Sequence, residues 1–145
     1  MKYLLVLSKY TSKRNFQHFY LFFLLCYNYQ FYFIVLGIDI HINMICNTLK
    51  QTFKQKRPYN NYDFIKYYNI KKKSFTFPSR SMANMTLLYL SFNYTFNNYY
   101  IDLYFKLNMF LLCITRNYRG LHYIHDMVFS FCLSYFLFNS IIHYK

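Results

Sequence analysis

Two long stretches without a formally charged residue lie near the two ends of this chain, and they constrain its fold more than any other feature. The first covers residues 15–38, which is 24 residues. As a helix it would be about 36 Å long, enough to cross a hydrocarbon core of about 30 Å. We therefore predict a membrane helix at 16–38, although Asn28 and Gln30 place amides in its middle and residues 27–31 also alternate as a strand would.

The second uncharged stretch covers residues 127–144, which is 18 residues with His143 taken as neutral. As a helix it would reach about 27 Å, which is a short span. Its polar residues are tolerable inside a membrane if they face another helix. They are Ser130, Ser134, Asn139 and Ser140. The sequence thus predicts a short membrane helix at 127–144.

A basic and less apolar region connects the two stretches. Four apolar residues recur at helical spacing between 42 and 53, and Pro58 ends the run. This pattern is typical of an amphipathic helix, which lies either in a membrane interface or over a core as an ordinary surface helix. The segment from 57 to 81 holds both prolines and is typical of a linker.

Residues 88–107 alternate between apolar and polar side chains. Residues 88–96 and 99–107 each follow the pattern, and Asn97-Asn98 separates them. If the two asparagines form a two-residue turn, every apolar residue of one segment faces an apolar residue of the other. Register and periodicity therefore agree in predicting a β-hairpin, which would need a third strand or a helix to cover it.

The charge balance is strongly basic, with 17 Lys and Arg against 4 acidic residues, none of which is Glu. Glu, Val, Ala, Asp and Gly have codons that begin with G, and together they supply 10 of the 145 residues. Phe and Tyr, by contrast, number 18 and 19. This bias is that of an AT-rich gene, and it produces a basic, aromatic chain without selection for function. A reading frame without a selected product is therefore one hypothesis for the chain.

Basic residues between 50 and 80 are interleaved with tyrosines. Phosphate neutralisation combined with aromatic stacking suits single-stranded nucleic acid, and the same residues suit anionic lipid headgroups beside a membrane helix. A solvated basic loop is the third interpretation, and we favour it. The candidate residues for anionic lipid or nucleic acid are Lys50, Lys54, Lys56, Arg57, Lys71, Lys72 and Lys73.

His122, His125 and Asp126 form the strongest metal-like pattern, since positions i, i+3 and i+4 share one face of a helix. No fourth ligand stands at a suitable spacing, and the same residues fit the polar mouth of a membrane span. The sequence also contains no glycine-rich phosphate loop and no nucleophile elbow. We therefore predict no metal, no cofactor, no catalytic residue and no enzymatic activity.

The sequence predicts a mainly α, membrane-associated small protein with one or two hydrophobic helices, a candidate β-hairpin at 88–107 and no defined globular fold. Four segments are expected: 1–46 with the first membrane helix, 47–86 basic and amphipathic, 87–110 with the hairpin, and 111–145 with the second helix. The predicted function is non-enzymatic, in anchoring or interaction. The alternatives are a nucleic-acid-binding component of an AT-rich genome or organelle, and the unselected reading frame. The expected partner is the lipid bilayer, without a small-molecule substrate, and the expected location is a membrane.

Overall fold

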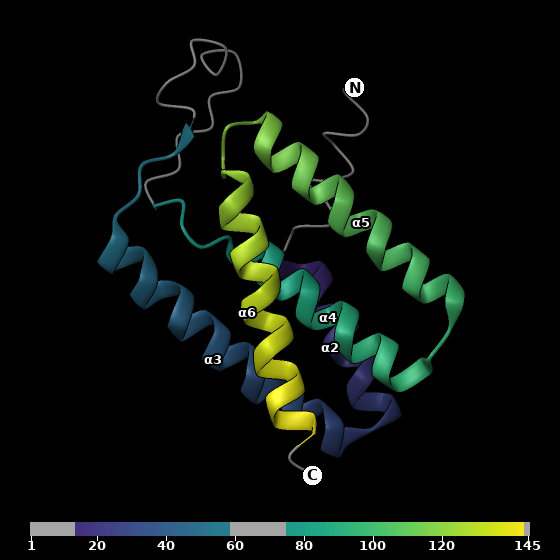
Figure 1. Ribbon diagram of the computed structural model, residues 1–145. Coiled ribbons are helices and arrows are strands. Elements are labelled where there is room, and N and C mark those ends of the chain that lie inside the picture. The colour runs from purple at the N-terminus through teal and green to yellow at the C-terminus, as the bar shows by residue number, and fades with distance from the viewer. Residues whose placement is uncertain (1–13, 59–74, 144–145) are drawn as a thin grey trace.

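The computed structural model describes residues 14–58 and 75–143, and these residues form a bundle of α-helices (Figure 1). The helices are α2 (Arg14–Tyr27), α3 (Tyr29–Phe53), α4 (Arg80–Phe96), α5 (Tyr99–Tyr118) and α6 (Ile124–Ile142). The prediction of a mainly α protein is confirmed. The expectation that the chain lacks a defined globular fold is wrong, because these helices pack around one shared core.

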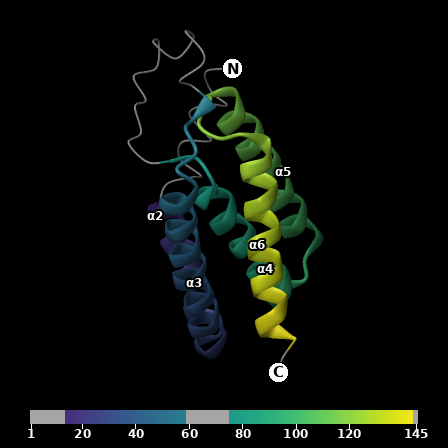
Figure 2. The same cartoon turned by 60° about the vertical axis from the view of Figure 1, so that its left-hand side comes forward.

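Helix α4 forms the centre of the bundle and packs against each of the other four helices (Figures 1 and 2). Its buried side chains lie on every side of the helix, from Met82 to Phe92. A helix that is buried all round has no polar face, so its sequence shows no helical period. Leu87 and Leu88 pack inward next to each other, with 2% and 4% of their surface exposed.

The β-hairpin predicted at 88–107 is wrong, and no strand occurs among the described residues. The chain does turn at Asn97-Asn98, but the turn joins α4 to α5. Asn97 ends α4 in the left-handed conformation (φ 39°, ψ 49°), and its N–H donates to the Asn93 carbonyl. The Asn98 side chain then accepts from the N–H of Tyr100 and of Ile101, which starts α5. The alternation was misleading because tyrosines counted as apolar on one face and polar on the other.

Asn28 divides the first uncharged stretch into two helices. Its side chain accepts from the N–H of Phe31 at 3.0 Å and starts α3, so the mid-span amide is a helix cap. Helix α3 then continues without a break as far as Phe53, through the region where an amphipathic helix was expected. The division of the chain into the four expected segments stays a prediction.

Helices α3 and α6 are long and apolar enough to cross a membrane. Only 22% and 28% of their apolar windows are buried inside the bundle. A core helix of a soluble protein would bury most of such a window, so these two helices face outward with apolar side chains. Large exposed apolar residues include Phe33, Met44 and Phe136.

Candidate active site

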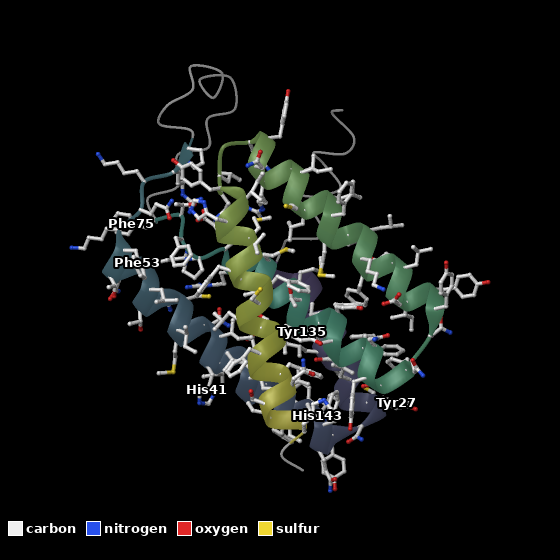
Figure 3. All side chains as sticks on the ribbon, in the orientation of Figure 1. Tyr27, His41, Phe53, Phe75, Tyr135 and His143 are labelled. Carbon is white, nitrogen blue, oxygen red and sulfur yellow. The ribbon has the colours of Figure 1, made fainter. Side chains whose placement is uncertain are left out.

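One end of the bundle gathers polar side chains from segments far apart in the sequence. Helix α3 ends there, and α4 and α6 begin there (Figure 1). The connecting segments 54–58, 75–79 and 119–123 meet at this end, and Figure 3 shows Phe53 and Phe75 beside it. Three hydrogen-bonded groups build the site: Lys50, Arg57 and the pair His122–Asp126.

Lys50, in the last turn of α3, holds the segment that leads into α4. Its Nζ donates to the carbonyl oxygens of Phe75, Thr76 and Pro78 at 3.1, 3.1 and 2.6 Å. An ammonium group has three donors, and all three are used here. The positive charge is therefore fixed at the start of α4.

Arg57 joins the same segment to the loop before α6. It is 5% exposed, its Nη1 donates to the Leu121 carbonyl at 2.6 Å, and its Nη2 donates to the Phe75 carbonyl at 3.2 Å. Both bonds hold the guanidinium against the loops on either side of the site. Leu121, the residue before His122, is thus hydrogen-bonded directly to the buried guanidinium of Arg57.

Asp126 lies in the first turn of α6 and is completely buried. Its Oδ2 accepts from the N–H of Tyr123 at 3.0 Å and from the hydroxyl of Thr76. Nδ1 of His122 lies 3.3 Å from the Thr76 oxygen and 3.6 Å from Oδ2 of Asp126. The carboxylate, the hydroxyl and the imidazole thus form one buried network.

The network assigns the tautomer of His122. Thr76 has one hydroxyl proton, and Asp126 is the nearer of its two acceptors, the other being the Leu121 carbonyl at 3.3 Å. The Thr76 oxygen therefore accepts from His122, which places the proton of the neutral imidazole on Nδ1. Nε2 carries the lone pair and has no hydrogen-bond partner among the described residues.

Burial lowers the pKa of His122 from 6.5 to about 4. The nearby carboxylate of Asp126 acts in the opposite direction and raises the pKa, while the charges of Arg57, Lys50 and Arg116 lower it further. His122 is consequently neutral at physiological pH. A neutral imidazole with a free Nε2 can act as a nucleophile or as a base.

Among the residues that the structure describes, positive charges outnumber negative ones around His122. Arg116, near the end of α5, is 8% exposed, and its charge acts on His122 together with those of Lys50 and Arg57. Gly120 makes this approach possible, because its positive φ of 58° reverses the chain after α5 and lets the Leu121 N–H donate to the Arg116 carbonyl at 3.0 Å. Positive charge gathered in this way attracts anions.

The start of α4 adds to the attraction for an anion. Ser79 is its N-cap, and the Ser79 N–H donates to Oγ of Ser130 at 2.7 Å. The helix dipole places partial positive charge at this end of α4, beside Lys50. Arg80 follows directly and donates to the side chain of Asn47 on α3.

Each residue of the predicted metal cluster reaches the site. His122 approaches Oδ2 of Asp126, while Nε2 of His125 lies 3.1 Å from Oδ1. The two imidazoles thus meet different oxygens, and the described residues contain no group of ligands able to hold a metal ion. His122 also precedes α6, so its spacing to Asp126 comes from the start of a helix instead of from a shared helix face.

Of the predicted basic residues, Lys50 and Arg57 lie in the site and Lys54 and Lys56 are exposed next to it. Lys71, Lys72 and Lys73 lie outside the described residues. The sequence interpretation missed Arg116, Thr76 and Ser79. The sequence did contain a signal for Arg116. This cation follows an apolar helical run and closely precedes two histidines, and that position indicates that it lies near them in the fold.

The structure thus defines a class of protein by its fold and its site: a helical bundle with two helices apolar enough to cross a membrane and a histidine and a carboxylate clustered with cations at one end. The sequence profile of the PAP2 superfamily matches residues 30–145, and the chain belongs to this superfamily. The fold resembles the crystal structure of a transmembrane PAP2-type phosphatidylglycerolphosphate phosphatase from Bacillus subtilis, with a TM-score of 0.73 and 15% identity. The match covers 97% of this chain and 76% of that one. A comparison with curated protein sequences gives no significant match.

These findings correct three predictions. A non-enzymatic function and the absence of enzymatic activity are both wrong, because the family and the fold are those of a phosphatase-type protein. The exclusion of a small-molecule substrate is wrong for the same reason. Nucleic-acid binding and a special link to an AT-rich genome receive no support. The prediction of a membrane location is confirmed by the transmembrane relative and the two apolar helices.

Proposed function

We propose that this chain is a membrane phosphatase that hydrolyses the phosphate monoester of a lipid. The observation that carries the proposal is the neutral His122, backed by buried Asp126 and surrounded by Lys50, Arg57 and Arg116. Such a site attracts a phosphate dianion and offers it a nucleophile.

In the proposed reaction, Nε2 of His122 attacks the phosphorus atom, and the bond from phosphorus to the leaving oxygen breaks with its electron pair going to that oxygen. The oxygen takes up a proton, and the lipid alcohol leaves. The histidine acquires positive charge as the bond forms, and the carboxylate of Asp126 stabilises that charge across the ring. Water then attacks the phosphohistidine, inorganic phosphate leaves, and His122 returns to its neutral form.

The three cations bind the non-bridging oxygens of the phosphoryl group while it passes from the lipid to His122. Lys50 and Arg57 are held by carbonyl oxygens of the loops that flank His122, so their charges are in place before substrate arrives. Preorganised charges of this kind stabilise a transition state more than mobile ones do. Their arrangement supports phosphoryl transfer over chemistry on a neutral substrate.

A lipid substrate is supported by where the site lies and by the known activity of the relative. The site lies at the ends of α3 and α6, the two helices apolar enough to cross a membrane. The solved relative is named for its action on phosphatidylglycerolphosphate, a lipid with a terminal phosphate monoester. Exposed Lys54 and Lys56 stand beside the site, and we assign them to anionic headgroups at the membrane surface.

The experiment is phosphate release by the purified protein in detergent micelles, with phosphatidylglycerolphosphate as substrate. The wild-type protein should release phosphate and His122→Gln should not. Rapid acid-free quenching should trap a phosphoenzyme in the wild type that is stable to base and labile to acid, as phosphohistidine is. His41→Gln is the matched control, because His41 is exposed on α3 and its ring contacts the Gly37 carbonyl of its own helix, away from His122 and Asp126. A wild-type protein that releases no phosphate would refute the proposal.

A further inference from the structure

Arg80 is a cation beside the site that the proposed reaction does not use. It is the first residue of α4, two positions after Pro78, whose carbonyl accepts from Nζ of Lys50 at 2.6 Å. The charge of Arg80 acts on Lys50 and on Cys46, which lies one turn before Lys50 on α3. Arg80 therefore lies at the edge of the group of cations around His122.

The hydrogen bonds of Arg80 leave part of its donor capacity unused. A guanidinium has five N–H donors. Nη2 of Arg80 donates to the side chain of Asn47 on α3, whereas its Nε is buried and has no hydrogen-bond partner among the described residues. A buried donor without a partner costs free energy, and more so when the group is charged. Arg80 thus has room for a further acceptor.

That acceptor is expected to be an anion. Asp126, the carboxylate of the site, pairs with His122 and His125. In the part of the chain that the structure describes, no carboxylate lies at ion-pair distance from Arg80. A guanidinium binds phosphate groups through two parallel N–H bonds. A phosphate group therefore supplies both the charge and the oxygens that Arg80 lacks.

Asn47 places the guanidinium of Arg80 on the membrane side of Lys50. Asn47 precedes Lys50 by three residues, so the two side chains are neighbours on one face of α3. Helix α3 is apolar enough to cross a membrane, and it ends at the site. The turn that holds Asn47 consequently lies nearer the bilayer core than the turn that holds Lys50.

A lipid whose terminal phosphate lies at His122 places the rest of its headgroup along this path. Its acyl chains stay in the hydrocarbon core, so the groups between the chains and the terminal phosphate extend from Lys50 towards the membrane. In phosphatidylglycerolphosphate these groups are a glycerol and a phosphodiester, which carries one negative charge. The phosphodiester is therefore the substrate group that passes closest to Arg80.

We infer that Arg80 is a specificity-determining residue of the proposed phosphatase and binds the phosphodiester of a lipid that carries two phosphate groups. Its guanidinium favours lipids with an anionic group one glycerol away from the scissile phosphate over lipids with a terminal phosphate alone. Asn47 orients that guanidinium from α3. This inference rests on the proposed function and names the substrate class of the same site.

The test compares two lipid phosphates in Arg80→Gln. Phosphatidylglycerolphosphate carries a phosphate monoester and a phosphodiester, whereas phosphatidic acid carries the monoester alone. We expect KM for phosphatidylglycerolphosphate, as a mole fraction in mixed micelles, to rise about tenfold or more, because a charge-assisted contact is lost. Its kcat, and KM for phosphatidic acid, should change less than about threefold, since the contact binds a group that does not react.

Two further variants complete the comparison. Arg80→Lys keeps the charge without the fork of donors, so it should recover part of the KM for phosphatidylglycerolphosphate. Lys106→Gln is the matched control, because Lys106 is exposed on α5 and pairs with Asp102. It should change KM for neither lipid.

The outcomes separate this inference from the proposed function. Equal rises in KM on the two lipids would overturn the inference alone, as would an unchanged KM for phosphatidylglycerolphosphate. A wild-type protein inactive on both lipids would overturn the proposed function and the inference with it. If Arg80→Gln does not fold, Asn47→Ala decides, because it keeps the charge of Arg80 and removes the exposed acceptor that orients it. KM should then rise for phosphatidylglycerolphosphate alone, and equal changes on the two lipids would overturn the inference.

Discussion

Nδ1 of His122 lies 3.6 Å from Oδ2 of Asp126, four residues further along the chain, and both side chains are buried. The carboxylate belongs to the first turn of α6, where the helix dipole favours negative charge. Asp126 therefore stabilises the first turn of α6 and also orients the ring of His122, the proposed nucleophile. Changes at Asp126 should alter stability and rate together.

Asp126→Asn keeps the size of the side chain and removes its charge. The positive charge that develops on His122 during attack then has no carboxylate partner, so kcat for phosphate release should fall at least about 100-fold. The bond from the Tyr123 N–H weakens as well, so we expect a loss of about 1 kcal/mol in stability. Steady-state kinetics and thermal unfolding in detergent measure the two effects.

Asp102→Asn is the matched control for this substitution. Asp102 lies on α5 and pairs with exposed Lys106 at 2.8 Å, away from the site. Its replacement should leave kcat unchanged. If Asp102→Asn lowered kcat as far as Asp126→Asn does, the role of the buried carboxylate would have to be abandoned.

The lowered pKa of His122, about 4, makes stability depend on pH. Between about pH 6.5 and pH 4 the unfolded chain binds a proton at this histidine and the folded chain does not. The free energy of unfolding should therefore fall as the pH is lowered through this window, by up to about 3 kcal/mol from this group. Unfolding in mixed micelles at pH 7.5 and pH 5 measures the change.

His122→Gln should remove most of this pH dependence, because Gln does not titrate. His41→Gln should retain it, since His41 is exposed on α3. Parallel pH profiles for the wild type and His122→Gln would show that another group is responsible.

The sequence analysis singled out several residues of the site but assigned them other functions. The spacing of His122, His125 and Asp126 stood out, yet a shared helix face suggested a metal site. Lys50 and Arg57 stood out as basic residues next to an apolar helix, and the pattern suggested lipid or nucleic acid. The sequence did not show that these residues lie together in space. Thr76 contacts Asp126, which is 50 residues further along the chain, and this contact depends on how α3, α4 and α6 pack.

The sequence predicted a helix correctly where a long apolar stretch carried no charge. It failed where a helix is buried on all sides, because the apolar residues of such a helix show no helical periodicity. Helix α6 matches the uncharged stretch at 127–144 closely. Helix α4 is buried on all sides, so its apolar residues follow no helical face and an accidental alternation remained. In α5, by contrast, Phe105, Met109 and Leu112 lie on one buried face, a helical spacing present in the sequence from the start.

Asn97 offers a test of the turn between α4 and α5. Its φ of 39° lies in the left-handed region, which glycine adopts without strain and β-branched residues resist. Asn97→Gly should leave stability unchanged or raise it by a few tenths of a kcal/mol, and Asn97→Val should lower it by about 1–2 kcal/mol. Thermal unfolding in detergent measures both, and Asn117→Gly, in the last turn of α5, should instead be destabilising.

Lys50→Met tests whether one ammonium group both anchors the loop and binds the phosphate. The thioether keeps the apolar stem but leaves the carbonyls of Phe75, Thr76 and Pro78 without their donor. We expect stability to fall by about 3 kcal/mol, since hydrogen bonds from charged donors are the stronger ones. KM for a lipid phosphate should rise as well, because one of the three cations is gone.

Lys50→Arg separates the two roles. It keeps the positive charge but replaces a compact group with three donors by a planar fork that cannot reach the same three carbonyls. KM should therefore recover further than stability does. Lys106→Met, which removes an exposed lysine paired with Asp102, should change neither quantity appreciably. If Lys50→Met unfolded no more readily than Lys106→Met, the carbonyl contacts would have no anchoring role, and the charge of Lys50 alone would explain its place beside the phosphate.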